Sequence, residues 1–306
     1  MNKILISIVG PTAIGKTALS IKLATHFNTE IISADSRQFY KEMNIGTAVP
    51  TEDELTAAPH HFIQHKSVQE KYSVGDFERD AISKLKVLHQ TKDIVIMVGG
   101  SGLYVKAIKE GLDYFPDIDS NVRLKLNKDL EEKGLSALQD QLKSLDIKAY
   151  NAMAVDNPHR VIRALEICLG TGKPYSSFLT NTSKNRPFRT ITIGLEADRS
   201  VMYDRINQRV EAMIENGLLD EVKTLLPYKH HNALNTVGYK ELFAYFEGSI
   251  TSDFAISEIK KNTRRFAKRQ LTWFRKDPSI KWFNYLQDPA DIITFLEDEI
   301  KKNPTS

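Results

Sequence analysis

Apolar residues along the chain form two kinds of pattern. Four short runs, at residues 4–9, 30–33, 93–98 and 190–195, are almost continuously apolar or β-branched. Such runs are typical of strands that are buried on both faces of a parallel sheet. Between the first three runs, residues 17–27 and 74–90 carry apolar residues at helical spacing. This alternation predicts an α/β fold, with a parallel sheet covered by helices on both faces.

The middle of the chain follows a different pattern. Residues 116–185 are rich in charge, show helical spacing and contain no convincing strand. After them, residues 200–226 and 254–276 predict two long amphipathic helices, the first ending near Pro227. We therefore expect a core domain of residues 1–115 and 186–306 that includes the C-terminal helices, and an all-helical insertion domain of residues 116–185.

Composition is that of an ordinary globular protein: 41% of the 306 residues are hydrophobic and 26% are charged. No run approaches the roughly 18 apolar residues that cross a bilayer, and the N-terminal apolar run lacks the features of a signal peptide. The single cysteine, Cys168, lies in an apolar run, so we assign it to the core and expect no disulfide. We expect a cytoplasmic protein that does not bind membranes.

A phosphate-binding loop directly follows the first predicted strand and precedes a predicted helix. Residues 10–17, GPTAIGKT, match the P-loop pattern G-x-x-x-x-G-K-[ST]. Backbone N–H groups of such a loop face phosphate oxygens, and the helix N-terminus adds positive potential. We expect Lys16 to reach a terminal phosphate and the Thr17 hydroxyl to hold Mg²⁺. The predicted anion site consists of Gly10, Pro11, Thr12, Ala13, Ile14, Gly15, Lys16 and Thr17.

Asp35 follows the second predicted strand, at the sheet edge where ligand crevices form. Nucleotide hydrolases usually place a Mg²⁺-binding carboxylate after an apolar strand, yet the run 93–98 leads into GGSGLY without an acid. Ser36, Arg37 and Gln38 follow Asp35, so one short loop offers an acid, a hydroxyl, a cation and an amide. We interpret Asp35 as a catalytic base; a Mg²⁺ ligand or a helix cap is the alternative.

Six motifs in one order resemble the tRNA dimethylallyltransferases, also called tRNA isopentenyltransferases. They are GPTAIGKT (10–17), SADSRQFY (33–40), GGSGLY (99–104), DNPHRVIRALEI (156–167), VGYKEL (237–242) and RFAKRQLTWFRK (265–276). Ser101 stands where the family usually has threonine, and Phe39 stands where a smaller apolar residue is common. The resemblance spans most of the chain.

The resemblance implies transfer of a dimethylallyl group from dimethylallyl pyrophosphate to N6 of adenosine 37 in a tRNA anticodon loop. The P-loop would hold pyrophosphate rather than ATP, and Asp35 would accept the proton of the attacking amine. An adenine must leave its stack to reach such a carboxylate. The resemblance also implies tRNA contacts for Asp35, Ser36, Arg37, Gln38, Ser101, Arg123, His159, Arg160, Val161, Ile162 and Arg163. From their apolar side chains alone, Val161 and Ile162 are better assigned to a helix core.

Basic residues concentrate near the C-terminus. The chain carries a net charge of +3, but residues 256–276 hold eight basic residues and one acid, so this segment alone carries +7. On a helical wheel that starts at Lys260, the six cations between 260 and 269 fall within about 0° to 180°. Ile259, Phe266, Trp273 and Phe274 fall at about 220° to 320°. We predict that the apolar half packs, and that the cationic half, Arg264 and Lys268 included, contacts RNA phosphates.

Arg205 and Arg209 lie four residues apart in a predicted helix. They would share one face and could reach the phosphates held by the P-loop, or they could be solvated surface charges.

Other functions share parts of this pattern. A small-molecule or nucleoside kinase would use the P-loop and the sheet but would leave the basic segment unexplained. A non-catalytic RNA-binding switch that hydrolyses nucleotide is a second alternative. His60, His61 and His65 suggest a zinc site, which we reject because no cysteine lies near them. We expect Mg²⁺ as the cofactor, tRNA and dimethylallyl pyrophosphate as partners, and a monomer.

Overall fold

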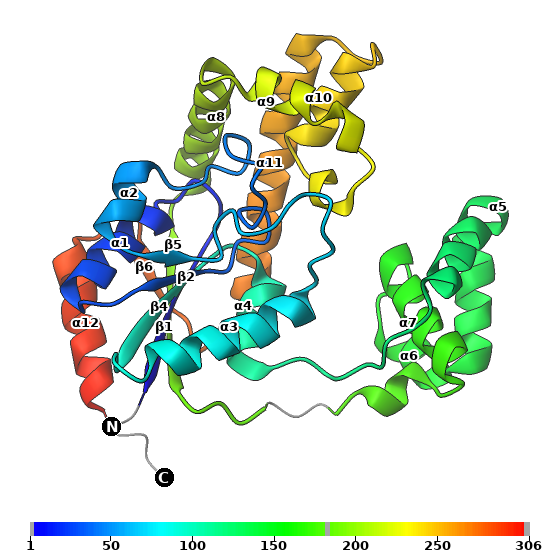
Figure 1. Cartoon of the computed structure of the whole chain (residues 1–306), viewed down its shortest axis with the longest axis horizontal. Helices are drawn as coiled ribbons and strands as arrows, with labels where there is room; N and C mark the ends of the chain where they lie inside the picture. Colours follow the sequence, from blue (N-terminus) through cyan, green and yellow to red (C-terminus); the bar gives the residue numbers. More distant parts are fainter. Residues whose placement is uncertain (1–2, 181–183, 303–306) are drawn as a thin grey trace. The chain divides into compact units, whose positions relative to one another are not determined.

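The computed structural model describes residues 3–180 and 184–302, and a parallel sheet lies at the centre of the larger part of the chain (Figure 1). Its strands follow the order β3-β2-β4-β1-β5-β6, and all neighbouring strands are parallel. The strands are β1 (Ile4–Val9), β2 (Ile31–Ser33), β3 (His60–His61), β4 (Ile94–Val98), β5 (Arg189–Glu196) and β6 (Lys281–Asn284).

Helices cover the sheet, and the residues in the middle of the chain are also helical. In chain order they are α1 (Lys16–His26), α2 (Glu52–Ala57), α3 (Val74–Leu88), α4 (Gly102–Glu110), α5 (Ser120–Leu145), α6 (Ile147–Ala152), α7 (Pro158–Thr171), α8 (Arg199–Glu215), α9 (Leu218–Thr224), α10 (Tyr239–Phe246), α11 (Ser252–Phe274) and α12 (Pro289–Lys301). Three short 3₁₀ helices are η1 (Tyr175–Phe178), η2 (Leu226–Tyr228) and η3 (Asn232–Leu234).

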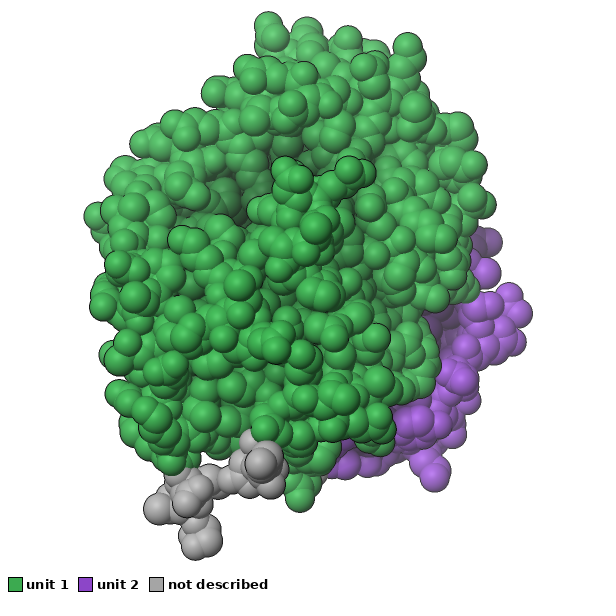
Figure 2. Space-filling view, turned by 60° about the vertical axis from the view of Figure 1, so that its left-hand side comes forward, with its two compact units in different colours: residues 1–110, 185–306 green, residues 111–184 purple. Residues whose placement is uncertain are grey.

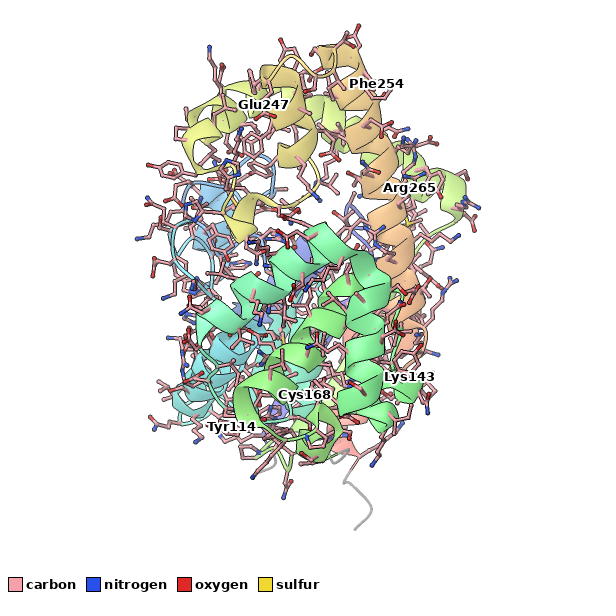
Figure 3. All side chains as sticks on the ribbon, turned by 90° about the vertical axis from the view of Figure 1, so that its right-hand side faces the viewer. Tyr114, Lys143, Cys168, Glu247, Phe254 and Arg265 are labelled. Atoms are coloured by element: carbon pink, nitrogen blue, oxygen red, sulfur yellow. The ribbon has the colours of Figure 1, made fainter. Side chains whose placement is uncertain are left out.

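The chain divides into two compact units (Figure 2). Unit 1, residues 1–110 and 185–306, contains the whole sheet, and unit 2, residues 111–184, is helical. In unit 2, α5 and α7 bury a core of their own that includes Leu126, Leu142 and Leu165. Cys168 is buried on α7, as its apolar surroundings predicted (Figure 3).

Successive side chains of β1 point to opposite faces of the sheet, and helices cover both faces. Ile4, Ile6 and Ile8 pack in one cluster with side chains of α1 and α12. Leu5 and Val9 face the opposite cluster, which contains side chains of α3, α4 and α11. Burial of both faces explains why the strands are continuously apolar. The predicted α/β fold with a parallel sheet is confirmed.

Two details of the fold differ from the prediction. The short edge strands β3 and β6 were not predicted, because β3 has only two residues and the chain around both strands is polar. Residues 200–226 do not form one helix: α8 ends at Glu215 and α9 begins at Leu218. Gly217 between them has a φ of 95°, a left-handed conformation that breaks a right-handed helix. Among the described residues, no helix is long and apolar enough to span a bilayer.

An aromatic cluster supports the segment that follows β2. The ring of His65 lies 5.5 Å from Phe39, 5.4 Å from Phe62 and 5.2 Å from Tyr72, measured between centroids. Both ring nitrogens of His65 are buried, and neither has a hydrogen-bond partner within the described part of the chain. Burial lowers the pKa of His65, so the native structure favours the neutral ring.

We predict that His65 makes the folded protein less stable in mild acid. An unfolded histidine titrates near pH 6.5, whereas the native pKa is lower. Protons therefore bind the unfolded chain preferentially as the pH falls through about 6.5, and the contribution of the neutral ring is complete only above that pH. Urea denaturation at pH 7.5 and pH 5.5 should show a smaller acid-induced loss of unfolding free energy in His65→Phe. Equal losses in the two proteins would contradict this.

Candidate active site

The P-loop connects β1 to α1 at the carboxyl edge of the sheet. Gly10 has a φ of 144°, and a Cβ on it would lie 2.6 Å from the carbonyl oxygen of Leu195 in β5. Gly15 has a φ of 106° and precedes the first residue of α1. The side-chain Nζ of Lys16 donates to the Pro11 carbonyl, 2.7 Å away. Glycines at both ends thus let the loop turn tightly, as a phosphate-binding loop requires.

A cavity of about 510 Å³ lies over the loop and is closed on one side by α8. Arg205 and Arg209 line it, so both face the P-loop rather than open solvent. Nε of Arg205 donates to the Ala13 carbonyl at 2.8 Å, and its guanidinium lies over the Tyr285 ring. The P-loop residues that line this cavity are Thr12, Ala13, Ile14, Gly15, Lys16 and Thr17.

Electrostatics in this cavity favour an anionic ligand. Burial lowers the pKa of Lys16 to about 8, while the negative charge of Asp35 raises it and the cation of Arg209 lowers it. Burial also lowers the pKa of Arg209, against the opposing effect of Asp35. Buried cations are costly until an opposite charge arrives, so phosphate oxygens placed here would relieve that cost.

Asp35 lies directly beyond β2 and is half-buried. Its Oδ1 accepts the backbone N–H of Arg37 at 3.0 Å. The next residue, Ser36, is joined to Ser101 by two contacts of 3.2 Å, from its backbone N–H and its hydroxyl. A Cβ on Gly99 would lie 2.6 Å from the Ala34 carbonyl oxygen. Close backbone packing therefore brings the loops after β2 and β4 together.

Arg37 and Gln38 hold this loop in place through backbone carbonyls. The guanidinium of Arg37 donates to Asn232 at 3.1 Å and to Ala233 at 2.8 Å. The amide of Gln38 donates to Thr47 at 3.3 Å and to Ala48 at 2.9 Å. Both side chains were predicted to contact RNA; in the structure both support the loop.

A second cavity, of about 690 Å³, also borders Asp35. Its walls come from the loops after β2 and β4 and from α8, α10 and α11, together with the loop before α10. The two cavities share five lining residues, which are Thr12, Asp35, Arg209, Phe266 and Gln270. Asp35 is therefore accessible from two chambers, one of which contains the P-loop.

Helix α11 does not divide into the two predicted halves. Ile259 and Phe274 are buried, but Phe266 is 39% exposed and Trp273 is 41% exposed, and both line the second cavity. The prediction that the apolar half packs therefore holds fully for Ile259 and Phe274, whereas these two aromatic residues are only partly covered. The helical wheel separates a polar face from an apolar one, but it cannot show that part of the apolar face borders a cavity.

The cationic side of α11 is also divided. Arg264 donates to the Asn207 side chain at 2.7 Å and lies over the Tyr203 ring, and Lys260 pairs with Glu211 at 2.6 Å. These two cations pack against α8. Arg265, Lys268 and Arg269 are exposed, and Figure 3 shows Arg265 on the outside of α11. Of the predicted pair, Lys268 is thus the more accessible to RNA.

In unit 2, the predicted RNA contacts differ in accessibility. Asn157 caps α7, and the following residues His159 and Arg160 are exposed. Arg123 and Arg163 both donate to the buried carboxylate of Glu166, at 3.0 Å and 2.9 Å. The side chains of Val161 and Ile162 are buried in the core of the unit. The prediction that these two side chains contact RNA is wrong, because α7 turns them inward. Their assignment to the core is confirmed.

One residue of the site was missed by the sequence analysis. Gln270 is buried between the two cavities. It falls at about 280° on the helical wheel, within the apolar half. A polar residue on an apolar face needs partners, and that signal could have identified it.

One histidine of the group His60, His61 and His65 is paired with a carboxylate. His61 pairs with Glu30 at 2.6 Å, and the described ranges contain no group of three His, Cys, Asp or Glu side chains placed to hold a metal.

Comparison with known proteins identifies the family. The family profile described as IPP transferase matches residues 38–277. The tRNA dimethylallyltransferase of Christiangramia forsetii is 62% identical over 300 residues, which cover 98% of this chain and 99% of that protein. The chain belongs to the tRNA dimethylallyltransferase family. This confirms the resemblance seen in the motifs and makes the protein a prenyltransferase.

Solved structures of the tRNA dimethylallyltransferase family share the fold. The full-length tRNA isopentenylpyrophosphate transferase of Bacillus halodurans matches with a TM-score of 0.73 at 38% identity, covering 98% of this chain and 97% of that one. A eukaryotic dimethylallyltransferase, described as acting on tRNA, matches with a TM-score of 0.82 at 26% identity, covering 99% and 81%.

We predict that pyrophosphate affinity depends on pH through Lys16. Anion binding favours charged lysine, whose pKa in the free protein is about 8. Affinity for inorganic pyrophosphate should therefore fall as the pH rises from 7 to 9.5. Lys16→Arg should lack this fall, since arginine stays charged. Calorimetric titration should compare the affinity of wild type with that of Lys16→Arg at each pH, because the ionisation of pyrophosphate itself affects both proteins equally. If the ratio of the two affinities stays constant across this pH range, the prediction is contradicted.

Proposed function

We propose that this protein transfers a dimethylallyl group from dimethylallyl pyrophosphate to N6 of adenosine 37 in the anticodon loop of tRNA. The observation that carries the proposal is the position of Asp35 between a cavity built on a P-loop and a second cavity lined by exposed aromatic and basic side chains. The relatives named as tRNA dimethylallyltransferases support the same reaction.

The first cavity would bind the donor. P-loop amides, Lys16, Arg205 and Arg209 surround a space suited to a diphosphate, and these groups can stabilise the charge that develops on the leaving oxygen. Mg²⁺ usually binds phosphate oxygens together with few protein groups. The Thr17 hydroxyl, which lines the cavity, fits this role, and Mg²⁺ held there would neutralise pyrophosphate charge.

The second cavity would bind the flipped adenine. Phe266 and Trp273 offer ring surfaces for a base, and Arg269 lies over the Phe266 ring. Aromatic and guanidinium planes of this kind are typical of sites for unstacked bases. Ser36 and Ser101 line the same cavity next to Asp35.

At the junction of the cavities, the N6 lone pair would attack C1 of the dimethylallyl group as the C–O bond to pyrophosphate breaks. The nitrogen then carries one proton too many, and the free oxygen of Asp35 accepts it. The adenine amine is a weak nucleophile, because its lone pair is delocalised into the ring, so this base should contribute roughly 10²–10⁴-fold to the rate.

RNA outside the cavity would be held by exposed cations. Lys268 and Arg265 on α11 and Arg160 on α7 are exposed, and phosphate contacts of this kind supply affinity. We further propose that the protein acts as a monomer in the cytoplasm.

The product mass tests the proposal directly. Purified protein, dimethylallyl pyrophosphate, Mg²⁺ and unmodified tRNA should give a tRNA nucleoside heavier by C₅H₈, located at position 37 by nuclease mapping. A kinase would instead add phosphate to its acceptor, and a nucleotide-hydrolysing switch would leave the RNA unchanged.

We predict that Asp35→Ala abolishes prenyl transfer but changes tRNA affinity by no more than a few-fold, because its role is to accept a proton. Single-turnover assays with saturating tRNA and filter binding measure the two effects separately. Retained turnover would rule out Asp35 as the base. A parallel loss of affinity and activity in Asp35→Asn would make it a binding residue instead.

We predict that replacing Arg265 and Lys268 together with glutamine weakens tRNA binding and lowers the slope of log K against log salt by up to about 1.4, at roughly 0.7 per single-strand phosphate contact. The single-turnover rate at saturating tRNA should change little. Arg264→Gln is the control variant. The guanidinium of Arg264 packs on α8, so its loss should lower the melting temperature but leave the salt slope close to that of wild type. An unchanged slope in the double variant would show that these cations do not contact RNA.

A further inference from the structure

Gln270 connects two loops of the site through its side-chain amide. Its Oε1 accepts the backbone N–H of Thr12 in the P-loop at 2.9 Å, and its Nε2 donates to the carbonyl of Gly100 at 3.0 Å. The residue is only 7% exposed. Both hydrogen-bonding groups of the amide are therefore occupied, one on each loop.

The fit around this amide leaves little space. A Cβ on Gly100 would overlap Nε2 of Gln270, so the turn after β4 lies directly against the amide. The same turn carries Ser101, which contacts Ser36 next to Asp35. One side chain from α11 is thereby linked to the P-loop and, through the contacts between Ser101 and Ser36, to the segment that carries Asp35.

We propose that Gln270 is a positioning residue for prenyl transfer: it fixes the distance between the P-loop and the turn after β4, and so aligns the donor cavity with Asp35. This inference rests on the proposed function. Gln270 itself does not touch the reacting atoms. A displacement of about 1 Å between reacting groups can cost about 10²-fold in rate, so loss of either hydrogen bond should affect catalysis more than the binding of RNA.

The geometry distinguishes two substitutions. Gln270→Met keeps the length of the side chain but removes both hydrogen bonds. Gln270→Glu keeps the acceptor for Thr12, but when ionised it cannot donate to Gly100. When protonated, a carboxylic acid has one carbonyl oxygen and one O–H, so it can restore both bonds. Burial raises the pKa of a carboxyl group, which brings this protonation into a range accessible to the assay.

The experiment measures kcat, the KM for dimethylallyl pyrophosphate and tRNA affinity between pH 5.5 and 8.5. Gln270→Met should lower kcat by about 10- to 100-fold and weaken inorganic pyrophosphate binding, with tRNA affinity within about threefold of wild type. The ratio of its kcat to that of wild type should not depend on pH. For Gln270→Glu, the ratio of its kcat to that of wild type should rise as the pH falls. Asp35 and Arg209 line both cavities and Lys16 lines the first. All three are present in every protein, so the ratio largely cancels their own effects on the pH profile.

A matched control separates positioning from general weakening of the helix. Ala255 is buried on α11 and lines neither cavity, so Ala255→Gly should lower the melting temperature without changing kcat. Wild-type kcat and pyrophosphate affinity in Gln270→Met, or a pH-independent ratio in Gln270→Glu, would overturn the proposal. If wild-type protein modified no tRNA, the proposed function would fail. Pyrophosphate binding by Gln270→Met would still test whether Gln270 positions the P-loop. Unchanged binding would overturn that role, and weakened binding would support it.

Discussion

Close packing of backbone at the carboxyl edge of the sheet is the constraint on which the rest of the site depends. Gly10 lies against the Leu195 carbonyl and Gly99 against the Ala34 carbonyl, each so near that a methyl group would collide with backbone. Parallel strands end at one edge, so their loops meet there. Without side chains at these two glycines, the P-loop, the Asp35 loop and the turn after β4 approach closely enough to share hydrogen bonds.

Charge in the site is balanced for a ligand that is itself anionic. Lys16, Arg205 and Arg209 line the cavity over the P-loop, and burial lowers the pKa of Lys16 and of Arg209. Asp35 offsets this only in part. A diphosphate would supply the missing negative charge, and its departure after transfer would return the site to a state in which the cations are held less favourably. Desolvation makes the cations of the free site less favourable, and it also strengthens their attraction to phosphate.

The sequence predicted those parts of the fold that depend on local pattern. Strands β1, β2, β4 and β5 were recognised from continuous apolar runs, and the P-loop from its spacing. Strand β3 was missed because two residues carry no periodicity, and the break at Gly217 because the amphipathic pattern continues on both sides of this single glycine. At the site, Arg264 could not be distinguished from Lys268, because only the tertiary structure shows that Tyr203 and Asn207 occupy the space beside Arg264. A pattern identifies a face, whereas accessibility depends on what covers that face.

Helix α11 illustrates how one element can serve several parts of a site. Along its length it buries Ile259 and Phe274, packs Lys260 and Arg264 against α8, and exposes Arg265 and Lys268. Its Phe266 and Trp273 line one cavity wall, and Gln270 links the P-loop to the neighbouring turn. Backbone hydrogen bonds join successive turns of such a helix, so its side chains keep fixed positions relative to one another along the axis. Any displacement of α11 by a bound RNA would therefore move Gln270 as well, and the P-loop amide bonded to it.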